Sequence, residues 1–287
     1  MQTYHIGHHR PTPLTDGTRT HDNHGTAPGF TLIELSIVLV IIGLLVGGVL
    51  VGRDLIRAAE LRSVMSDVER FKTAINTFRL KYNCIPGDCL NATDYFGTGS
   101  GGCPTGARTG TQTCNGNGNG MIDLGVGQSP AFDTSAAANI ETFLIWQHLG
   151  AAQLIQGTYT GVPGSTNNYN HLLGTNCPMS RIAGAGYEFL DETLFPPDAN
   201  LYAVYSGPML IFGSQSFDGQ MWNPTAIASI DAYSIDSKMD DGLPASGVIV
   251  SYTHTFAPNC ATSDNPVAAS YSNNTNKGCA VIYRNMY

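Results

Sequence analysis

Residues Gly29-Phe30-Thr31-Leu32-Ile33-Glu34-Leu35 open an apolar run that continues to Gly52. From Phe30 to Gly52 there are 23 residues and one charged side chain, Glu34. At about 1.5 Å rise per residue, a helix over this run is roughly 35 Å long, enough to cross a hydrocarbon core of about 30 Å. The apolar core of a cleaved secretory signal is shorter, roughly 7–15 residues. The run therefore predicts a transmembrane helix.

Glu34 is the unusual residue of this run, because a carboxylate is costly in lipid and usually has a partner or a task there. Gly29, the hydrophobic Phe30 and a glutamate four positions after Phe30 coincide with a membrane span. This combination resembles the processing and methylation signature of type IV pilins and of the pseudopilins of type II secretion. The resemblance implies that a prepilin peptidase cuts after Gly29 and that the new amine of Phe30 is then methylated.

The same resemblance implies a role for Glu34 in subunit assembly, and two pairings are open. Phe30 and Glu34 are four residues apart on one helix, so the carboxylate could pair with its own terminal amine. It could instead neutralise the amine of a neighbouring subunit, where an unpaired ion in a low-dielectric filament core would be costly. The second pairing would also fix the axial register between subunits.

Residues 1–29 are polar and have no apolar periodicity, which predicts a disordered leader. They hold five of the eight histidines: His5, His8, His9, His21 and His24. A metal site could be imagined from three of these, but a leader that is cut off is the expected reading. The leader departs from many in the family by having Pro28 where a basic residue is common.

Beyond the membrane run, residues 53–83 predict an amphipathic helix with one narrow apolar stripe. Its apolar side chains recur at alternating steps of three and four residues: Leu61, Val64, Val68, Phe71, Ile75, Phe78 and Tyr82. A two-stranded coiled coil would give the same stripe. Because a strand-rich segment follows, we expect the stripe to pack on a sheet within the same chain.

Residues 84–287 predict a loop-rich globular head outside the cytoplasm. Strands are indicated by β-branched and aromatic residues at 186–190, 201–205, 209–212, 248–256 and 279–283. Helices are indicated at 136–155 and 225–235. The expected fold is therefore α+β and pilin-like, with a long N-terminal helix packed on an antiparallel sheet. The expected division is a leader at 1–29, a membrane half at 30–52, an amphipathic half at 53–83 and the head.

The charge is unevenly distributed along the chain. Residues 53–81 carry seven basic and four acidic side chains, whereas residues 82–287 carry five basic and fifteen acidic ones. An acidic head repels phosphate backbones, so direct nucleic-acid binding by the head is disfavoured. A basic groove formed between subunits of a polymer is not excluded by this count.

All seven cysteines follow the membrane run, and an odd number leaves one thiol over. A bridge between Cys260 and Cys279 is expected from the resemblance, because many pilins close their C-terminal loop with a disulfide. We further expect Cys84–Cys89 to clamp the turn after the long helix. Cys103–Cys114 would close the glycine-rich loop, which leaves Cys177 unpaired.

Two oxygen-rich segments could bind a cation. Asn115, Asn117, Asn119 and Asp123 alternate around a glycine, as ligands do in an EF-hand-type calcium loop. The twelfth position is a valine rather than glutamate, so weak calcium binding and a plain glycine-asparagine turn are both open. The second segment has three aspartates, Asp236, Asp240 and Asp241, for which a solvated turn partly paired with Lys238 is favoured.

No motif of phosphate-binding, zinc-peptidase or serine-hydrolase type is present, so an enzyme is not expected. The resemblance instead implies a structural subunit that is held in the inner membrane, with its N-terminus in the cytoplasm, and assembled into a type IV pilus-type filament. Its length suggests a minor subunit. Implied partners are similar pilin-like subunits, the prepilin peptidase, inner-membrane assembly machinery and membrane lipid. A type II secretion pseudopilin and a signal-anchored binding protein are the alternatives.

Overall fold

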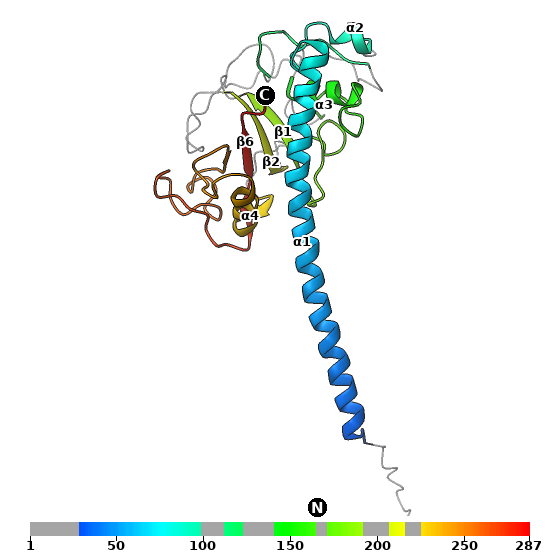
Figure 1. Ribbon diagram of the computed structural model, residues 1–287, viewed down its shortest axis with the longest axis vertical. Coiled ribbons are helices and arrows are strands. Elements are labelled where there is room, and N and C mark those ends of the chain that lie inside the picture. The colour runs from blue at the N-terminus through cyan, green and yellow to red at the C-terminus, as the bar shows by residue number, and fades with distance from the viewer. Residues whose placement is uncertain (1–28, 99–111, 123–140, 165–170, 192–206, 216–224) are drawn as a thin grey trace, which may run out of the picture. The chain divides into compact units, whose positions relative to one another are not determined.

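The computed structural model describes residues 29–98, 112–122, 141–164, 171–191, 207–215 and 225–287 (Figure 1). The chain divides into two compact units, Met1–Gly52 and Arg53–Tyr287. The helix α1 (Leu32–Tyr82) runs through the boundary between them.

In the first unit, the described residues belong almost entirely to the beginning of α1, and all of their side chains up to Val51 are exposed. The apolar window in α1 has a mean hydropathy of 2.8 and none of it is buried. Among the described residues, α1 is the one helix that is long and apolar enough to cross a membrane. Because a core helix of a soluble protein would be covered, this exposure favours a segment that is surrounded by lipid.

The second unit is built on a four-stranded antiparallel sheet with the order β1-β2-β6-β4. Its strands are β1 (Ala185–Asp191), β2 (Pro208–Ser214), β4 (Ile249–Val250) and β6 (Val281–Arg284). A separate antiparallel pair joins β3 (Ile227–Ala228) to β5 (Lys277–Cys279). The helices of this unit after α1 are α2 (Ala92–Phe96), α3 (Glu141–Ala151) and α4 (Ser229–Met239).

The apolar stripe of α1 belongs to the core of this unit, as expected for packing on a sheet within one chain. Phe71 is 1% exposed, and its ring lies 5.1 Å from the ring of Trp146 on α3 and 5.0 Å from that of Tyr187 on β1. The Tyr187 hydroxyl donates a hydrogen bond to Asp67, one turn before Phe71. Phe71 therefore packs α1 against both α3 and β1.

The α+β class and the antiparallel sheet agree with the sequence, but two elements differ from their predicted bounds. The strand expected at 248–256 is only Ile249–Val250. Asp240 accepts hydrogen bonds from the amides of Val248 and Ile249, and the chain turns again where the Ala257 amide bonds to the Thr253 carbonyl. These local bonds replace the ladder that a longer strand would need.

The helix expected at 225–235 begins later, at Ser229. The preceding strand Ile227–Ala228 pairs with β5, and the Ala226 amide donates to the carbonyl of Cys279, which is bridged to Cys260. Pairing with β5 therefore overrides the helical pattern there. The helix expected at 136–155 is observed as Glu141–Ala151, and residues 136–140 and the strand expected at 201–205 lie outside the described residues.

Truncation of Phe71 tests this account of the core. In a soluble fragment, residues 53–287, Phe71→Ala should lower the free energy of unfolding by about 3–5 kcal/mol, because a buried aromatic ring leaves a cavity. Lys72→Ala, at the exposed next position, should change it by less than about 0.5 kcal/mol. Urea denaturation followed by tryptophan fluorescence measures both. Equal effects of the two substitutions would contradict packing of the stripe on the sheet.

Candidate functional site

Glu34 lies in a reciprocal cap at the beginning of α1. Its carboxylate Oε2 accepts hydrogen bonds from the Thr31 amide and from the Thr31 hydroxyl, each at 2.8 Å. The Glu34 amide in turn donates to Thr31 Oγ1 at 3.2 Å. Thr31 is thus the N-cap and Glu34 the third helical residue of a capping box, which satisfies amides that the first turn leaves unpaired.

The sequence reading missed this cap, although the signal was present. A threonine followed three positions later by glutamate, directly before an apolar run, is the usual sequence signature of a capping box. The two Thr31 hydrogen bonds both use Oε2. Among the described residues, no hydrogen bond or ion pair reaches Oε1 of Glu34.

Gly29 and Phe30 lie directly before α1 and belong to no helix or strand. Phe30 is 83% exposed, and a Cβ added at Gly29 would meet nothing within 4 Å. No contact with the described residues therefore requires glycine at this position. A requirement for a small residue would have to come from another protein that handles this peptide bond.

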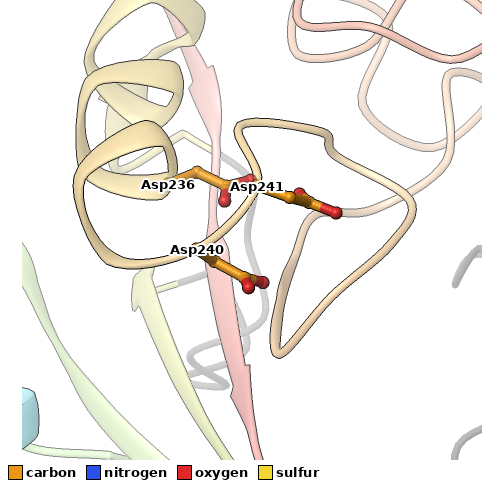
Figure 2. A group of neighbouring side chains, drawn as sticks. All are labelled: Asp236, Asp240 and Asp241. Carbon is orange, nitrogen blue, oxygen red and sulfur yellow. The ribbon is translucent and has the colours of Figure 1, made fainter.

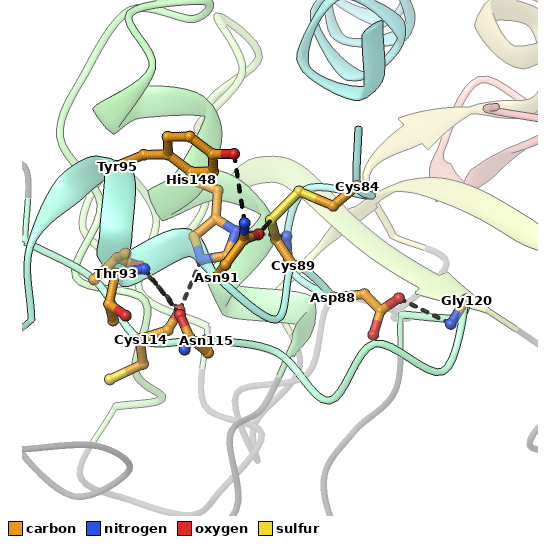
Figure 3. Close-up of a disulfide and its surroundings, with 12 residues drawn as sticks. Cys84, Asp88, Cys89, Asn91, Thr93, Tyr95, Cys114, Asn115, Gly120 and His148 are labelled. Carbon is orange, nitrogen blue, oxygen red and sulfur yellow. Dashed lines mark hydrogen bonds between the residues drawn. A yellow bond between two sulfur atoms is a disulfide. The ribbon is translucent and has the colours of Figure 1, made fainter. Parts of the chain in front are cut away.

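The turn after α1 is fixed by a disulfide and by a buried histidine (Figure 3). Cys84 and Cys89 are bridged, with their Cα atoms 5.1 Å apart. His148 of α3 accepts a hydrogen bond from the Gly87 amide at Nδ1, 2.8 Å, and its Nε2 lies 2.9 Å from the Cys114 carbonyl oxygen. Nδ1 is therefore the unprotonated nitrogen and Nε2 donates, so this imidazole is a neutral structural link.

The predicted calcium loop follows this turn. The side-chain oxygen of Asn115 accepts from the Thr93 amide, that of Asn117 from the Asn119 amide and that of Asn119 from the Met121 amide. Asp123, the fourth expected ligand, lies outside the described residues.

Two buried carboxylates that the sequence reading missed also hold this loop. Asp88 accepts hydrogen bonds from the amides of Asn119 and Gly120, at 3.0 and 2.8 Å. Glu141 accepts from the Asn117 amide at 2.8 Å. Their distance in sequence from the loop explains why no local pattern revealed them. With or without calcium, the loop is thus fastened to the turn after α1 and to the beginning of α3.

The three aspartates at the end of α4 lie together, with one ligand-type oxygen of each within 4.8 Å of the others (Figure 2). Asp236 is buried and accepts hydrogen bonds from the Tyr271 hydroxyl at 2.8 Å and the Gly242 amide at 3.1 Å. Asp240 and Asp241 accept from backbone amides and a serine hydroxyl of the following loop.

These bonds make the aspartates a support for the loop after α4. The loop passes so close to Asp240 that a Cβ on Gly247 would lie 1.9 Å from its Oδ2, and Gly247 also has a φ of +74°. Only glycine fits there. The expected pairing with Lys238 is not seen among the described residues, where Lys238 instead donates to Ser234.

Burial raises the pKa of Asp236 from an ordinary 3.8 to about 7. The hydrogen bonds from Tyr271 and Gly242 oppose this rise, and the neighbouring carboxylates Asp241 and Asp240 add to it. Protonation of Asp236 removes a charge from the interior at neutral pH and below.

Two of the expected disulfides are formed in the structure, Cys84–Cys89 and Cys260–Cys279. Cys114 is also disulfide-bonded, and its expected partner Cys103 lies outside the described residues. Cys177 is a free, buried thiol. Burial, with a smaller effect of Glu188, raises the pKa of this thiol well above its usual range, so Cys177 is not a candidate nucleophile.

The comparisons with known proteins bear on the N-terminus alone. Residues 27–50 match the family model of the prokaryotic N-terminal methylation motif. No curated protein and no solved structure matches the chain. The chain thus carries the N-terminal signature of a prepilin-type precursor of a pilin or pseudopilin, which indicates a structural subunit that is anchored in a membrane before assembly.

The calcium interpretation gives a measurable prediction for the fragment 53–287. With neutral asparagine ligands, affinity should be in the millimolar range, and ten times the dissociation constant of calcium should add about 1.4 kcal/mol to the free energy of unfolding. Thermal melts should show this gain, and Asp123→Asn should remove it without changing the calcium-free melting temperature. As a control, Asp88→Asn should lower the melting temperature with and without calcium. No calcium-dependent gain in the unsubstituted fragment would leave a plain turn.

A second prediction concerns Asp236. Because its pKa in the folded state, about 7, lies above an unfolded value of about 3.9, the folded state binds more protons between these limits. The contribution to stability is complete below about pH 4 and is lost as the pH rises through about 7.

The melting temperature of the fragment 53–287 should therefore fall between pH 5 and pH 8, and Asp236→Asn should flatten this fall. Asp94→Asn, at an exposed position, should leave the pH dependence unchanged. An unaltered slope in Asp236→Asn would show that another group titrates in this range.

Proposed function

We propose that this chain is a prepilin-type structural subunit that is cut after Gly29, N-methylated at Phe30 and assembled into a type IV pilus-type filament. The observation that carries the proposal is the match of residues 27–50 to the methylation motif, on a helix whose membrane-length apolar window is wholly exposed. Apolar surface of this kind costs roughly 25 cal/mol of free energy per Å² that is exposed to water. It is stable in lipid or among similar helices, and a subunit that moves from membrane to filament uses both.

The size of this uncovered surface supports the proposal. Leu32, Leu39 and Leu44 are 86%, 70% and 73% exposed. No other part of the described chain covers them. In lipid, neighbouring helices gain little from the hydrophobic effect, so association there depends on packing and on polar groups. Glu34 is the one charged group that this part of α1 offers.

Cleavage after Gly29 would create an amine at Phe30, and methylation would retain its positive charge. The capping box holds the Glu34 carboxylate through Oε2, so Oε1 can accept a further hydrogen bond. We propose that Oε1 receives the terminal amine of a neighbouring subunit. In a low-dielectric helix bundle, this pair would neutralise two ions and select one axial offset between subunits.

In this proposal the subunit waits in the inner membrane, where its apolar run spans the bilayer and its head lies outside the cytoplasm. Assembly machinery of the secretion type then transfers it into a helical polymer with its long helices at the centre. A pseudopilin of a type II secretion system would use the same N-terminus in the same way. Surface filaments that can be sheared from cells indicate a pilus, whereas loss of secreted proteins in a deletion strain indicates a pseudopilin.

Glu34 variants test the proposed pairing, because substitution by glutamine removes the negative charge and retains the capping hydrogen bonds. Glutamine can serve in a capping box in place of glutamate, but it cannot neutralise an amine. Both Glu34→Gln and Glu34→Ala should be cut and accumulate in the membrane, while their incorporation into sheared filaments should fall at least tenfold, as a lost partner of a buried charge costs several kcal/mol. Immunoblots of sheared and membrane fractions measure this.

Normal filament yield from Glu34→Gln with a defect in Glu34→Ala would mean that Glu34 acts only as a cap. Gly29→Leu serves as the control for processing and should leave the full precursor uncut. N-terminal mass analysis distinguishes the two steps, because the Glu34 variants should begin at Phe30 and the Gly29 variant at Met1.

A further inference from the structure

The head is attached to α1 shortly after the apolar run ends. Arg57 of α1 donates hydrogen bonds from Nε, at 3.1 Å, and from Nη2 to the same carboxylate oxygen of Asp231 in α4. Its Nη1 donates to Glu60 at 3.0 Å. Both side chains of the Arg57–Asp231 pair are at least two-thirds buried, so the beginning of α4 is held at the level of Arg57.

This attachment limits how far α4 can be from a membrane. Arg57 follows Gly52 by five residues, which is about 7.5 Å in a helix and at most about 18 Å in any conformation. The headgroup zone on each side of a hydrocarbon core is roughly 5–8 Å thick. When the apolar run spans a bilayer, the connection from Gly52 therefore keeps Arg57, and with it the beginning of α4, within about 18 Å of the end of that run.

At this level α4 exposes apolar and aromatic side chains. Ile230 is 49% exposed and Tyr233 is 51% exposed, and their spacing of three residues places them on one face of α4. The opposite face, with Ala232 and Ile235, is buried against the head. In Figure 1, α4 and α2 lie at different levels along α1, and α2 is near the C-terminal end of α1.

Two further exposed apolar side chains lie near this level on α1. Leu55 and Ile56, directly before Arg57, are 67% and 63% exposed. The charges around them nearly cancel, because Arg53 is followed by Asp54 and Arg57 is bonded to two carboxylates, Glu60 and Asp231, which leaves one net negative charge. This composition, with a tyrosine, aliphatic side chains and little net charge, fits the interfacial zone of a bilayer rather than a charged partner.

We propose that Ile230 and Tyr233, with Leu55 and Ile56, form a membrane-contacting surface that rests in the phospholipid interface while the subunit is anchored. The head then touches the bilayer in addition to being tethered by α1, in the manner of an interfacial helix. The inference needs membrane anchoring but not filament assembly, so it goes beyond the proposed function.

Lipid-quenching fluorescence on the full, uncut chain tests the proposal. A single cysteine introduced at position 230 or 233 is labelled with an environment-sensitive fluorophore, and the chain is reconstituted in phosphatidylcholine vesicles with or without shallow nitroxide-labelled lipid. The native thiol Cys177 is buried, and label taken up by the parent chain gives the blank. Tyr95→Cys is the matched control, because Tyr95 is 49% exposed and lies on α2.

The label of Ile230→Cys and Tyr233→Cys should be quenched several-fold more strongly than that of Tyr95→Cys, and 1 M salt should not remove the difference. Equal quenching at Tyr233 and Tyr95, or a difference that salt abolishes, would overturn the apolar lipid contact. Blue-shifted emission that weakens as lipid is added, without quenching, would identify a second copy of the chain as the occupant and also overturn it.

Leu44→Cys, in the apolar run, reports insertion independently. Quenching there without quenching at Tyr233 refutes the membrane-contacting surface and leaves the proposed function intact. Absence of quenching at Leu44 refutes membrane anchoring itself, and both proposals fall with it.

Discussion

The structure depends on one helix that must meet two different surroundings along its length. Up to Gly52 the side chains of α1 are apolar on all sides and uncovered, whereas from Leu61 onward only a narrow stripe is apolar and that stripe is buried in the head. A helix hydrophobic all round is stable in lipid or inside a protein, and a helix with one stripe is stable on the surface of a core. The change of pattern near Arg53 therefore determines where the head can begin. A soluble fragment that starts at Cys84 would lack the core residues that α1 supplies, whereas one that starts at Arg53 retains them.

The long helix was predictable because its signals are local and periodic. The apolar run, the three-and-four spacing of the stripe and the strands around Tyr187 and Leu210 follow from patterns within a few turns of chain. The cap formed by Thr31 was equally local and was overlooked. The short strand β4 and the late beginning of α4 were not predictable from local pattern. Asp240 takes an amide that a longer β4 would use in the sheet, and the backbone at Cys279 pairs with residues that would otherwise begin α4. The buried supports Asp88 and Glu141 were missed for the same reason.

In the head, carboxylates accept hydrogen bonds from backbone amides that, in a larger sheet, would bond to a neighbouring strand. Asp88, Glu141 and Asp240 each accept backbone amides from a loop that is distant or irregular. A carboxylate can accept several hydrogen bonds and requires no strand register, so it can fasten loops of different shapes. This explains how a chain with short strands and many glycines keeps a defined interior. It also places carboxylates in the interior, and burial raises the pKa of one of them, Asp236.

The lone thiol of Cys177 has a consequence for how the covalent framework persists. Disulfide exchange proceeds through attack by a thiolate on an accessible sulfur. In the folded chain Cys177 is inaccessible and its pKa is raised by burial, so it can neither form the nucleophile nor reach Cys84–Cys89 or Cys260–Cys279. Before the core closes around it, the same thiol is an ordinary competitor for every bridge. Folding therefore stops exchange by this thiol, and the mature head retains the disulfide bonds that are present when the core closes.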